Sequence, residues 1–262
     1  MTTGRPPQPF TWGDKSTFRL RVTDKYEPIQ PWIFLACIDV LGATAVVDIG
    51  ANIGFYSLTS TLGSSIRQVV GFEAAPASAA EFRANVDANG LADVVAVEQV
   101  AVSDEIGEAE FLMQDGTSGM NALANTTLHL REDYSAAPIT VRTVTLDSWC
   151  AEHGLPPGPI GVKVDVEGGE GAVFRGAQRL LSSRELFIQA EMFEAQRARD
   201  TAVLLDLGYE RLLRCDNDWY WTNSSELADR WLDVVELAMT NCVRAHKKMW
   251  PPVSTPGESS PP

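Results

Sequence analysis

The chain has 262 residues, of which 45% are hydrophobic, and this is enough for one buried core without a division into two domains. Its formal net charge of −14 at pH 7 disfavours nucleic acid as a partner, because no basic patch is available to neutralise phosphates. The longest apolar runs have only the length of strands, so we expect neither a membrane span nor a signal peptide. A cytoplasmic location is the default expectation.

The composition along the chain predicts one domain with two irregular ends. We expect a flexible segment over residues 1–17, a single domain over residues 18–250 and a disordered tail over residues 251–262, which is rich in proline and serine. The cysteines and histidines are scattered and favour neither a zinc site nor a disulfide framework. They are Cys37, Cys150, Cys215, Cys242, His129, His153 and His246.

The domain begins with elements that precede its most informative motif. After a short strand over residues 18–22, Pro31 suits the first turn of a helix that we expect to run to about Leu41 and to pack near the substrate mouth. The stretch VVDIGANIGFYS, residues 46–57, then joins an apolar strand to a glycine turn and a helix, with Asp48 at the junction. Such a helix directs N–H groups at a ligand, so the stretch predicts a nucleotide-type cofactor site.

The spacing of Asp48, Gly50, Asn52 and Gly54 distinguishes between cofactors. Asn52 stands where the fingerprint G-x-G-x-x-G has its second glycine, which disfavours a nicotinamide dinucleotide and therefore an oxidoreductase. The same order suits S-adenosylmethionine, whose zwitterionic amino acid part needs a backbone turn and polar groups. An ordinary strand-to-helix turn gives the same pattern, so the hypothesis depends on residues further along the chain.

A second strand, residues 69–73, ends in Glu73, about twenty residues beyond the glycine turn, as in Rossmann-like folds. A carboxylate at this place can accept hydrogen bonds from both hydroxyls of a ribose. The alternative is a structural acid near the N-terminus of the helix that Pro76 opens. Residues 94–102 are expected to form the third strand.

Two strand-like runs flank a polar segment between residues 109 and 144. Glycine, asparagine and threonine are frequent in this segment, and such a length inside a compact domain is often functional. We expect a β-excursion that carries a lid loop over the substrate. A surface loop without a role is the alternative.

The C-terminal half predicts two more buried strands, a hairpin and a long helix. We expect residues 160–166 to form the first strand and to lead into one helix that ends near Leu181, and we expect residues 186–192 to form the second strand. The runs around Asp218 are typical of a terminal hairpin. An apolar stripe over residues 227–245 then indicates a helix that packs on the core or serves as the contact face of a homodimer.

Three carboxylates at the ends of these strands are the candidate catalytic residues, namely Asp165, Glu167 and Glu191. Open α/β sheets bind ligands beyond the carboxyl ends of their strands, so we expect the three near Asp48. Methyl transfer from a sulfonium needs alignment, exclusion of water and acceptance of a proton, and Asp165 is the first candidate for the base. Lys163 alternates with Asp165 and Glu167, so all three share one face if the strand runs that far.

Other interpretations of these acids stay open. Oxygen ligands from different strand ends suit Mg²⁺, which would polarise a substrate diol, although several carboxylates in a crevice do not specify a metal site. Alternatively, Glu167 and Glu170 stabilise the N-terminus of the next helix, and Lys163 is structural and pairs with an acid.

The order of the motifs resembles that of the FkbM-type methyltransferases. That family has a DIGANIG-like motif, an acid after the second strand, an AVSD-like segment, a TLD segment and a K-x-D-x-E-G-x-E segment. Here the five motifs stand at Asp48 to Gly54, Glu73, Ala101 to Asp104, Thr145 to Asp147, and Lys163 to Glu170. The family often has proline directly after the acid, whereas this chain has EAAP. The resemblance implies a Rossmann-like class I methyltransferase fold, an α/β fold with a mostly parallel seven-stranded sheet, helices on both faces and a terminal antiparallel hairpin.

The resemblance also implies transfer of a methyl group from S-adenosylmethionine to a hydroxyl of a small molecule, such as a sugar unit of a glycoconjugate or a secondary metabolite. A cofactor-binding regulatory or scaffold protein without turnover is the alternative. The cofactor-binding residues expected are Asp48, Gly50, Asn52 and Gly54 for the methionine part, Glu73 for the ribose, and Ser103 and Asp104 near the adenine.

Overall fold

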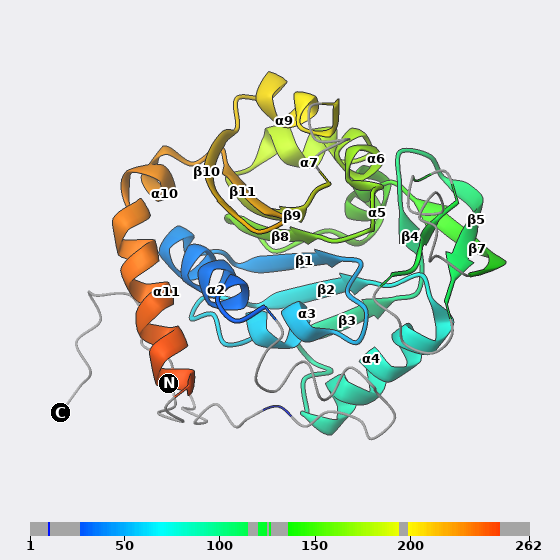
Figure 1. The fold of residues 1–262 in the computed structure, drawn as a ribbon, viewed down its shortest axis with the longest axis horizontal. Helices are drawn as coiled ribbons and strands as arrows, with labels where there is room; N and C mark the ends of the chain where they lie inside the picture. The colour runs from blue at the N-terminus through cyan, green and yellow to red at the C-terminus, as the bar shows by residue number, and fades with distance from the viewer. Residues whose placement is uncertain are drawn as a thin grey trace.

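The computed structural model describes residues 10, 27–114, 120–124, 126, 136–193 and 199–246. These residues form a central sheet flanked by helices and a second, smaller sheet at one end (Figure 1). The strand expected over residues 18–22 and the tail expected over residues 251–262 lie outside the described residues. So does the expected flexible segment over residues 1–17, apart from Phe10.

The central sheet has seven strands: β1 (Ala45–Ile49), β2 (Gln68–Phe72), β3 (Val95–Glu98), β8 (Ile160–Val164), β9 (Leu186–Glu191), β10 (Glu210–Cys215) and β11 (Asp218–Thr222). Their order is β10-β11-β9-β8-β1-β2-β3. The strands from β9 to β3 are parallel to one another, and β11 is antiparallel to both of its neighbours. The expected mostly parallel sheet with a terminal antiparallel hairpin is therefore confirmed.

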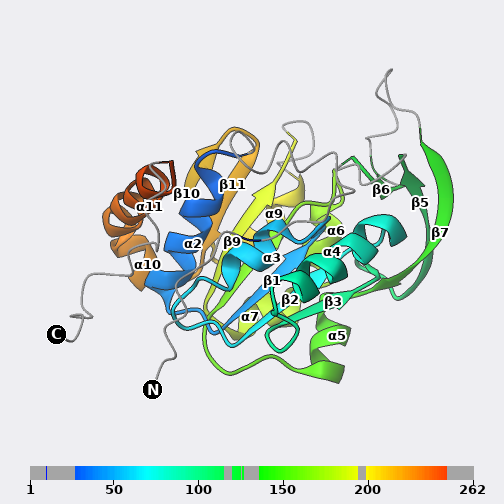
Figure 2. The same cartoon turned by 90° about the horizontal axis from the view of Figure 1, so that it is seen from below.

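Helices cover both faces of this sheet (Figures 1 and 2). Successive side chains of a strand point to opposite faces, so Val46 packs with Phe34 on one face and Val47 packs with Trp149 on the other. Both faces are buried, which explains the continuous apolar runs in the sequence. The first face carries α2 (Gln30–Leu41), α3 (Phe55–Ser60), α4 (Pro76–Ala88), α10 (Ser225–Asp229) and α11 (Trp231–His246), and the second carries α5 (Leu146–His153), α6 (Glu170–Arg175), α7 (Gln178–Ser183) and α9 (Ala202–Asp206).

Two expected elements are each divided in the structure. The strand expected over residues 94–102 is β3 followed by β4 (Ala101–Val102), and β4 belongs to the second sheet. The helix expected to end near Leu181 is interrupted at Gly176 and forms α6 and α7. A Cβ at Gly176 would lie 2.1 Å from the carbonyl oxygen of Ser103, so the interruption allows the segment after β4 to approach the backbone there.

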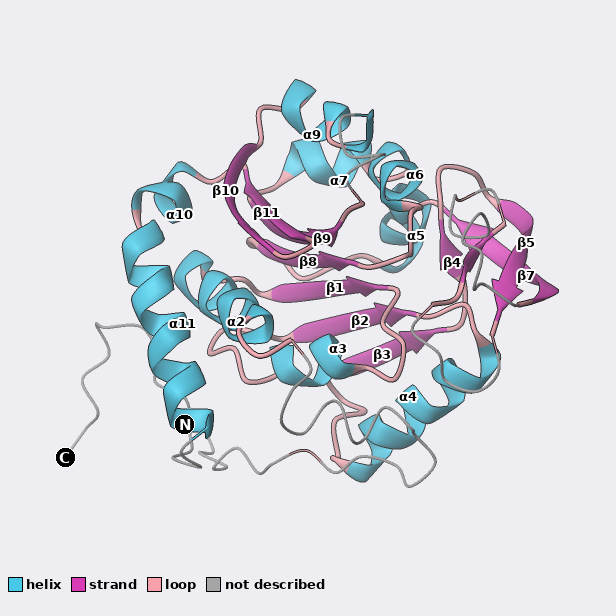
Figure 3. Cartoon of the chain, viewed as in Figure 1, coloured by secondary structure: helices cyan, strands magenta, loops and turns pink. Residues whose placement is uncertain are grey.

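The second sheet contains the expected β-excursion, formed by β5 (Gly107–Met113), β6 (Ala122–Leu123) and β7 (Ala137–Val144), together with β4. It lies on the side toward which the arrows of β1 and β2 point (Figure 3). Most of the expected lid loop falls outside the described residues. The described part includes Thr126, whose Cγ2 would lie 3.9 Å from a Cβ at Gly169 in the loop after β8.

The helix α11 packs on α2 through the expected apolar stripe, in which Val234 and Ala238 are buried. Its outer side exposes Leu232, Met239 and Val243. The homodimer that the sequence suggests stays a prediction. Within the described part of the chain, no helix combines the length and the apolar character that a membrane span requires.

Candidate active site

The glycine turn after β1 lies where the strand order of the sheet changes direction, between β2 and β8. The N–H groups of Gly50 and Ala51 both donate to the carbonyl oxygen of Phe72 at the end of β2, at 2.9 Å. On the other side, a Cβ at Gly50 would lie only 1.8 Å from the carbonyl oxygen of Asp165, and the residue has φ +80°. Glycine is therefore required at this turn. It opens the crevice in which sheets of this kind bind their ligands.

Glu73 fastens the glycine turn to the segment that follows β2. Its Oε2 accepts a hydrogen bond from the N–H of Asn52 at 2.8 Å, and its Oε1 accepts one from the N–H of Ala75 at 2.7 Å. Burial raises the pKa of Glu73 to about 7, although both hydrogen bonds act in the opposite direction. Asn52 has a left-handed backbone, and its Oδ1 is buried without a partner among the described residues. Such an acceptor indicates a missing donor.

Asp48 has a partner within the protein. It is buried near the end of β1, and its Oδ2 accepts a hydrogen bond from the hydroxyl of Ser57 on α3 at 2.6 Å. Burial raises the pKa of Asp48 to about 6, and the hydrogen bond from Ser57 partly offsets this. The contact fixes α3 against the strand. Direct contact between Asp48 and a cofactor stays a prediction.

Ser103 and Asp104 lie at the junction of the two sheets. The N–H of Ser103 donates to the carbonyl oxygen of Val144 at 2.9 Å. Asp104 forms a partly exposed ion pair with Arg175 of α6, with 2.9 Å between Oδ2 and Nη2. These contacts join the AVSD segment to the helix after β8. That the two residues lie near an adenine remains a prediction.

Lys163 is the centre of a buried polar network. Its side chain is 1% exposed, and its Nζ lies 3.0 Å from Oδ1 of Asp218 on β11 and 3.4 Å from Oδ2 of Asp165. Burial alone would lower the pKa of Lys163, but the neighbouring carboxylates outweigh it and raise this pKa well above its ordinary value. Lys163 is therefore a permanent cation that pairs with acids, as the structural interpretation of this residue expects.

The network continues from Lys163 to the segment before α2. Nε2 of Gln189 donates to Oδ1 of Asp218 and to the hydroxyl of Tyr56, both at 2.8 Å. The hydroxyl of Tyr56 in turn donates to the carboxylate of Glu27. The sequence alone did not identify the four residues that extend this network from Lys163, which are Asp218, Gln189, Tyr56 and Glu27. A polar residue within an otherwise apolar buried run, such as Gln189 in LFIQAE, is the feature that would have indicated them.

Two of the three candidate catalytic carboxylates meet directly. Asp165 follows β8, Glu191 ends β9, and their side chains share a hydrogen bond. The negative charge of Asp165, together with burial, raises the pKa of Glu191 to about 9. Glu191 is therefore protonated at pH 7 and can donate this hydrogen bond to Asp165.

Glu167, the third candidate, adds negative charge around Glu191 but does not lie on a strand. The strand β8 ends at Val164, and Glu167 has φ +54° in the turn that follows. The expected common strand face for Lys163, Asp165 and Glu167 required a strand as far as Glu167, and this condition is not met. The three candidates are nevertheless close enough to interact, because strands and turn end at one edge of the sheet.

Glu170 holds the turn after β8 in place. It is the first residue of α6, it is buried, and its Oε1 accepts hydrogen bonds from the N–H groups of Val166 and Gly168 at 3.2 Å. Burial raises the pKa of Glu170 to about 7. These contacts support the structural interpretation of Glu170.

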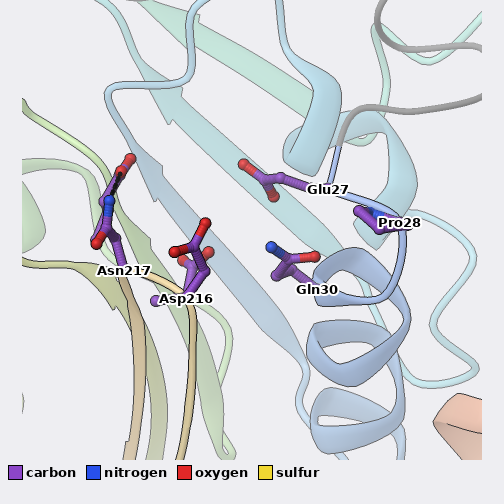
Figure 4. Close-up of a pocket in the computed structure, with 7 residues that line it drawn as sticks. Glu27, Pro28, Gln30, Asp216 and Asn217 are labelled. Carbon is purple, nitrogen blue, oxygen red and sulfur yellow. Dashed lines mark hydrogen bonds between the residues drawn. The ribbon is translucent and has the colours of Figure 1, made fainter.

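A cavity of about 360 Å³ lies beside the network (Figure 4). One wall comes from the segment that leads into α2 and the other from the turn between β10 and β11, and the two face each other in Figure 4. The helix expected near a substrate mouth thus contributes to a cavity. The described residues that line it are Glu27, Pro28, Gln30, Glu191, Asp216, Asn217 and Asp218.

The Mg²⁺ hypothesis receives no support from these acids. In the described ranges, no group of three or more histidine, cysteine, aspartate or glutamate side chains is arranged to hold a metal ion. Asp165 and Asp218 are instead paired with Lys163, and Glu191 interacts with Asp165.

The order of the strands, the glycine turn at the point where that order reverses and the acid after the second strand are the features of a class I methyltransferase fold. The comparison with protein families agrees. The model of the methyltransferase FkbM domain matches residues 48–217, and the chain belongs to this family. A curated relative, the 2-O-methyltransferase NoeI of Sinorhizobium fredii, is 28% identical over 164 residues. The match covers 58% of this chain and 66% of the relative, just under two thirds of its length.

Solved structures of methyltransferases resemble this chain more distantly. The precorrin-6y C5,15-methyltransferase of Geobacter metallireducens has a TM-score of 0.46 and 12% identity, with 81% of this chain and 92% of that chain covered. An O-methyltransferase of Bacillus cereus in complex with SAH has a TM-score of 0.44 and 16% identity, with 78% and 84% covered. These similarities concern the fold alone.

Proposed function

We propose that this protein transfers a methyl group from S-adenosylmethionine to a hydroxyl of a small polyol, such as a sugar unit of a glycoconjugate or a hydroxylated secondary metabolite. The observation that carries the proposal is the Asp165–Glu191 pair, which lies at one sheet edge with the glycine turn and beside a polar cavity. The similarity to a 2-O-methyltransferase supports an oxygen acceptor.

The residues around the glycine turn fit this cofactor. Among the described residues, no group donates a hydrogen bond to the buried Oδ1 of Asn52, and the cofactor has an ammonium and hydroxyl groups to offer. Each carboxylate oxygen of Glu73 accepts one backbone N–H and keeps a lone pair for a ribose hydroxyl. Gly50 and Gly54 allow the turn to approach its neighbours, and Asp48 fixes the helix behind it. The bound cofactor supplies an electrophilic methyl group on a sulfonium.

Asp165 is the base in this proposal. A hydroxyl becomes a better nucleophile when its proton moves to a carboxylate in the transition state. Lys163 holds one oxygen of Asp165 at 3.4 Å, and the proton on Glu191 hydrogen-bonds to the same carboxylate, so the orientation of Asp165 is fixed. Glu167 is the second candidate, and Glu191 is the positioning partner.

Calorimetric titration with S-adenosylmethionine and S-adenosylhomocysteine tests the cofactor, with and without EDTA and Mg²⁺. Turnover of methyl-labelled S-adenosylmethionine with a panel of sugars and polyols then tests the reaction. We expect binding of both ligands and label on an acceptor oxygen. Absence of binding would reject the site around Asp48 and Glu73, and label on nitrogen or carbon would reject O-methylation. Binding without turnover of any acceptor would favour the regulatory alternative.

Asp165→Asn tests the base. The amide keeps the size of the carboxylate but cannot take the proton, and loss of general base catalysis typically costs about 10²–10⁴-fold in rate. We expect kcat to fall by about this factor while affinity for S-adenosylhomocysteine is retained. A folded variant with an unchanged kcat would move the role to Glu167.

A further inference from the structure

The cavity between the α2 segment and the β10–β11 turn carries an excess of negative charge. Four of the described residues that line it are acidic, and none of them is basic: Glu27, Glu191, Asp216 and Asp218. The ammonium of Lys163, which lies 3.0 Å from Oδ1 of Asp218, is shared with Asp165. Among the described residues, Lys163 therefore compensates only part of the negative charge that these four carboxyl groups would carry if all were ionised.

Two of these carboxyl groups, those of Glu27 and Glu191, have raised pKa values. Burial raises the pKa of Glu27 to about 7, and the attraction of Lys163 offsets this only in part. Glu191 is held protonated by Asp165, as described above. A ligand with a positive charge beside Glu27 would replace the proton of this carboxyl group, because it stabilises the ionised carboxylate.

An independent observation shows that the cavity also presents a hydrogen-bond donor. Gln30 is 8% exposed and lines the cavity. Its Oε1 accepts a hydrogen bond from the N–H of Ile29 at 3.2 Å, whereas its Nε2 has no partner among the described residues. In Figure 4 the amide nitrogen of Gln30 points across the cavity toward Asp216. An amide donor without a protein partner at the wall of a cavity is available to an acceptor atom of a ligand.

We propose that this cavity binds the methyl acceptor through a protonated amine, so that the acceptor is an amino alcohol such as an amino sugar with a free ammonium. The inference rests on the proposed function and names its substrate class. The ammonium donates to the carboxylates of Glu27 and Asp216, which come from opposite walls. The Nε2 of Gln30 donates to an oxygen of the same ligand, and a neighbouring hydroxyl is presented to Asp165.

An ammonium fits this cavity better than the two other ligand types. A divalent metal needs several carboxylates around one point, and the described acids provide no such group. A neutral polyol could satisfy Gln30 but would bring no positive charge to the carboxyl groups that line the cavity. The three donors of an ammonium can reach separate oxygens, which suits acids that stand on facing walls.

Calorimetric titration of the full chain, saturated with S-adenosylhomocysteine, tests the inference with three matched probes. They are 2-amino-2-deoxyglucose, its N-acetyl derivative and glucose, which differ in charge at one position. We expect the amine to bind at least about tenfold more tightly than either neutral sugar. Its binding should release protons, measured as a dependence of the heat on the ionisation enthalpy of the buffer, whereas neutral sugars should not.

The variant Asp216→Asn removes one cavity charge and keeps the backbone, because residue 216 has φ +57° and asparagine tolerates this conformation. Asp206→Asn, at the exposed end of α9, is the control with the same change in net charge. The preference for the amine should fall in Asp216→Asn and persist in Asp206→Asn. Equal affinity for charged and neutral probes, or no binding of the amine, would overturn the inference. Failure to bind S-adenosylhomocysteine in the first step would instead count against the proposed function.

Discussion

At the scale of single residues, the site uses carboxyl groups in pairs of different character. Asp218 is paired with a buried cation, Asp165 with both that cation and a protonated carboxyl, and Glu73 with two backbone N–H groups. Each partner fixes the direction of the carboxyl oxygen that it contacts. Removal of a partner should therefore have a different consequence at each carboxyl.

Glu73→Ala should weaken binding of S-adenosylhomocysteine by about 1–3 kcal/mol, the range for loss of a charge-assisted hydrogen bond. The variant also loses the contact with the N–H of Asn52, so the glycine turn becomes less ordered. Calorimetry measures the affinity, and Glu105→Ala, at an exposed position, is the control. Unchanged affinity in a folded Glu73→Ala protein would refute the ribose assignment.

Lys163→Met should lower the free energy of unfolding by about 3–5 kcal/mol, because it leaves buried carboxylates without their cation. Urea denaturation measures this change. The double variant Lys163→Met with Asp218→Asn should regain part of the loss, since it removes the charge that was left unpaired. A double variant less stable than Lys163→Met alone would show that the pair is not the source of the effect.

At the scale of elements, burial patterns predict which segments form strands but not which neighbours interrupt them. Residues 160–166 and 186–192 were expected as strands and form β8 and β9 almost over their full length. The helix after β8 was expected to be continuous because its apolar spacing is continuous. Its break at Gly176 depends on the approach of Ser103, which is distant in the sequence.

The residues of the candidate site also fall into two groups, those whose position the topology predicts and those whose role depends on contacts with distant segments. Asp165 and Glu191 were predicted because parallel strands end at one edge, so their position depends on topology alone. Glu27 and Asp218 were missed because their roles depend on side-chain contacts between segments far apart in the chain, such as Lys163 with Asp218. Periodicity contains no information about such pairs.

Gly176→Ala should lower the free energy of unfolding by about 1–3 kcal/mol, the usual cost of overpacking. The new Cβ would lie 2.1 Å from a backbone carbonyl oxygen, so α6 must move away from the segment after β4. Gly169→Ala is a suitable control, because its φ of −98° is accessible to alanine and its Cβ would lie 3.3 Å from a side-chain methyl of Val166 and 3.6 Å from the nearest backbone oxygen. Equal effects of the two variants in chemical denaturation would refute the role of close approach.

At the scale of the whole molecule, acidic residues outnumber basic ones, and several of the acids are buried around the site. The formal net charge is −14, and several acids are buried around the crevice with only one buried lysine among the described residues. Folding therefore places carboxyl groups where ionisation is unfavourable. The stability of the protein should depend on pH in the direction that these groups set.

The free energy of unfolding should fall as the pH rises from about 5 to about 9. Burial raises the pKa of Asp48 to about 6 and those of Glu73 and Glu170 to about 7, and Glu191 reaches about 9. Each group is an acid with a higher pKa in the folded protein than in the unfolded chain, so the folded state binds more protons. This contribution is complete below the unfolded pKa values and is lost as the pH passes through the folded ones.

Urea denaturation at pH 5, 7 and 9 measures this dependence, and Glu170→Gln isolates one contribution to it. The amide oxygen can still accept from the N–H groups of Val166 and Gly168, but the side chain no longer ionises. Relative to the wild type, the variant should therefore gain roughly 1–3 kcal/mol between pH 5 and pH 8, because the wild type alone loses a proton from residue 170. A difference between the two proteins that stays constant over this range would show that Glu170 ionises as readily in the folded protein as in the unfolded chain.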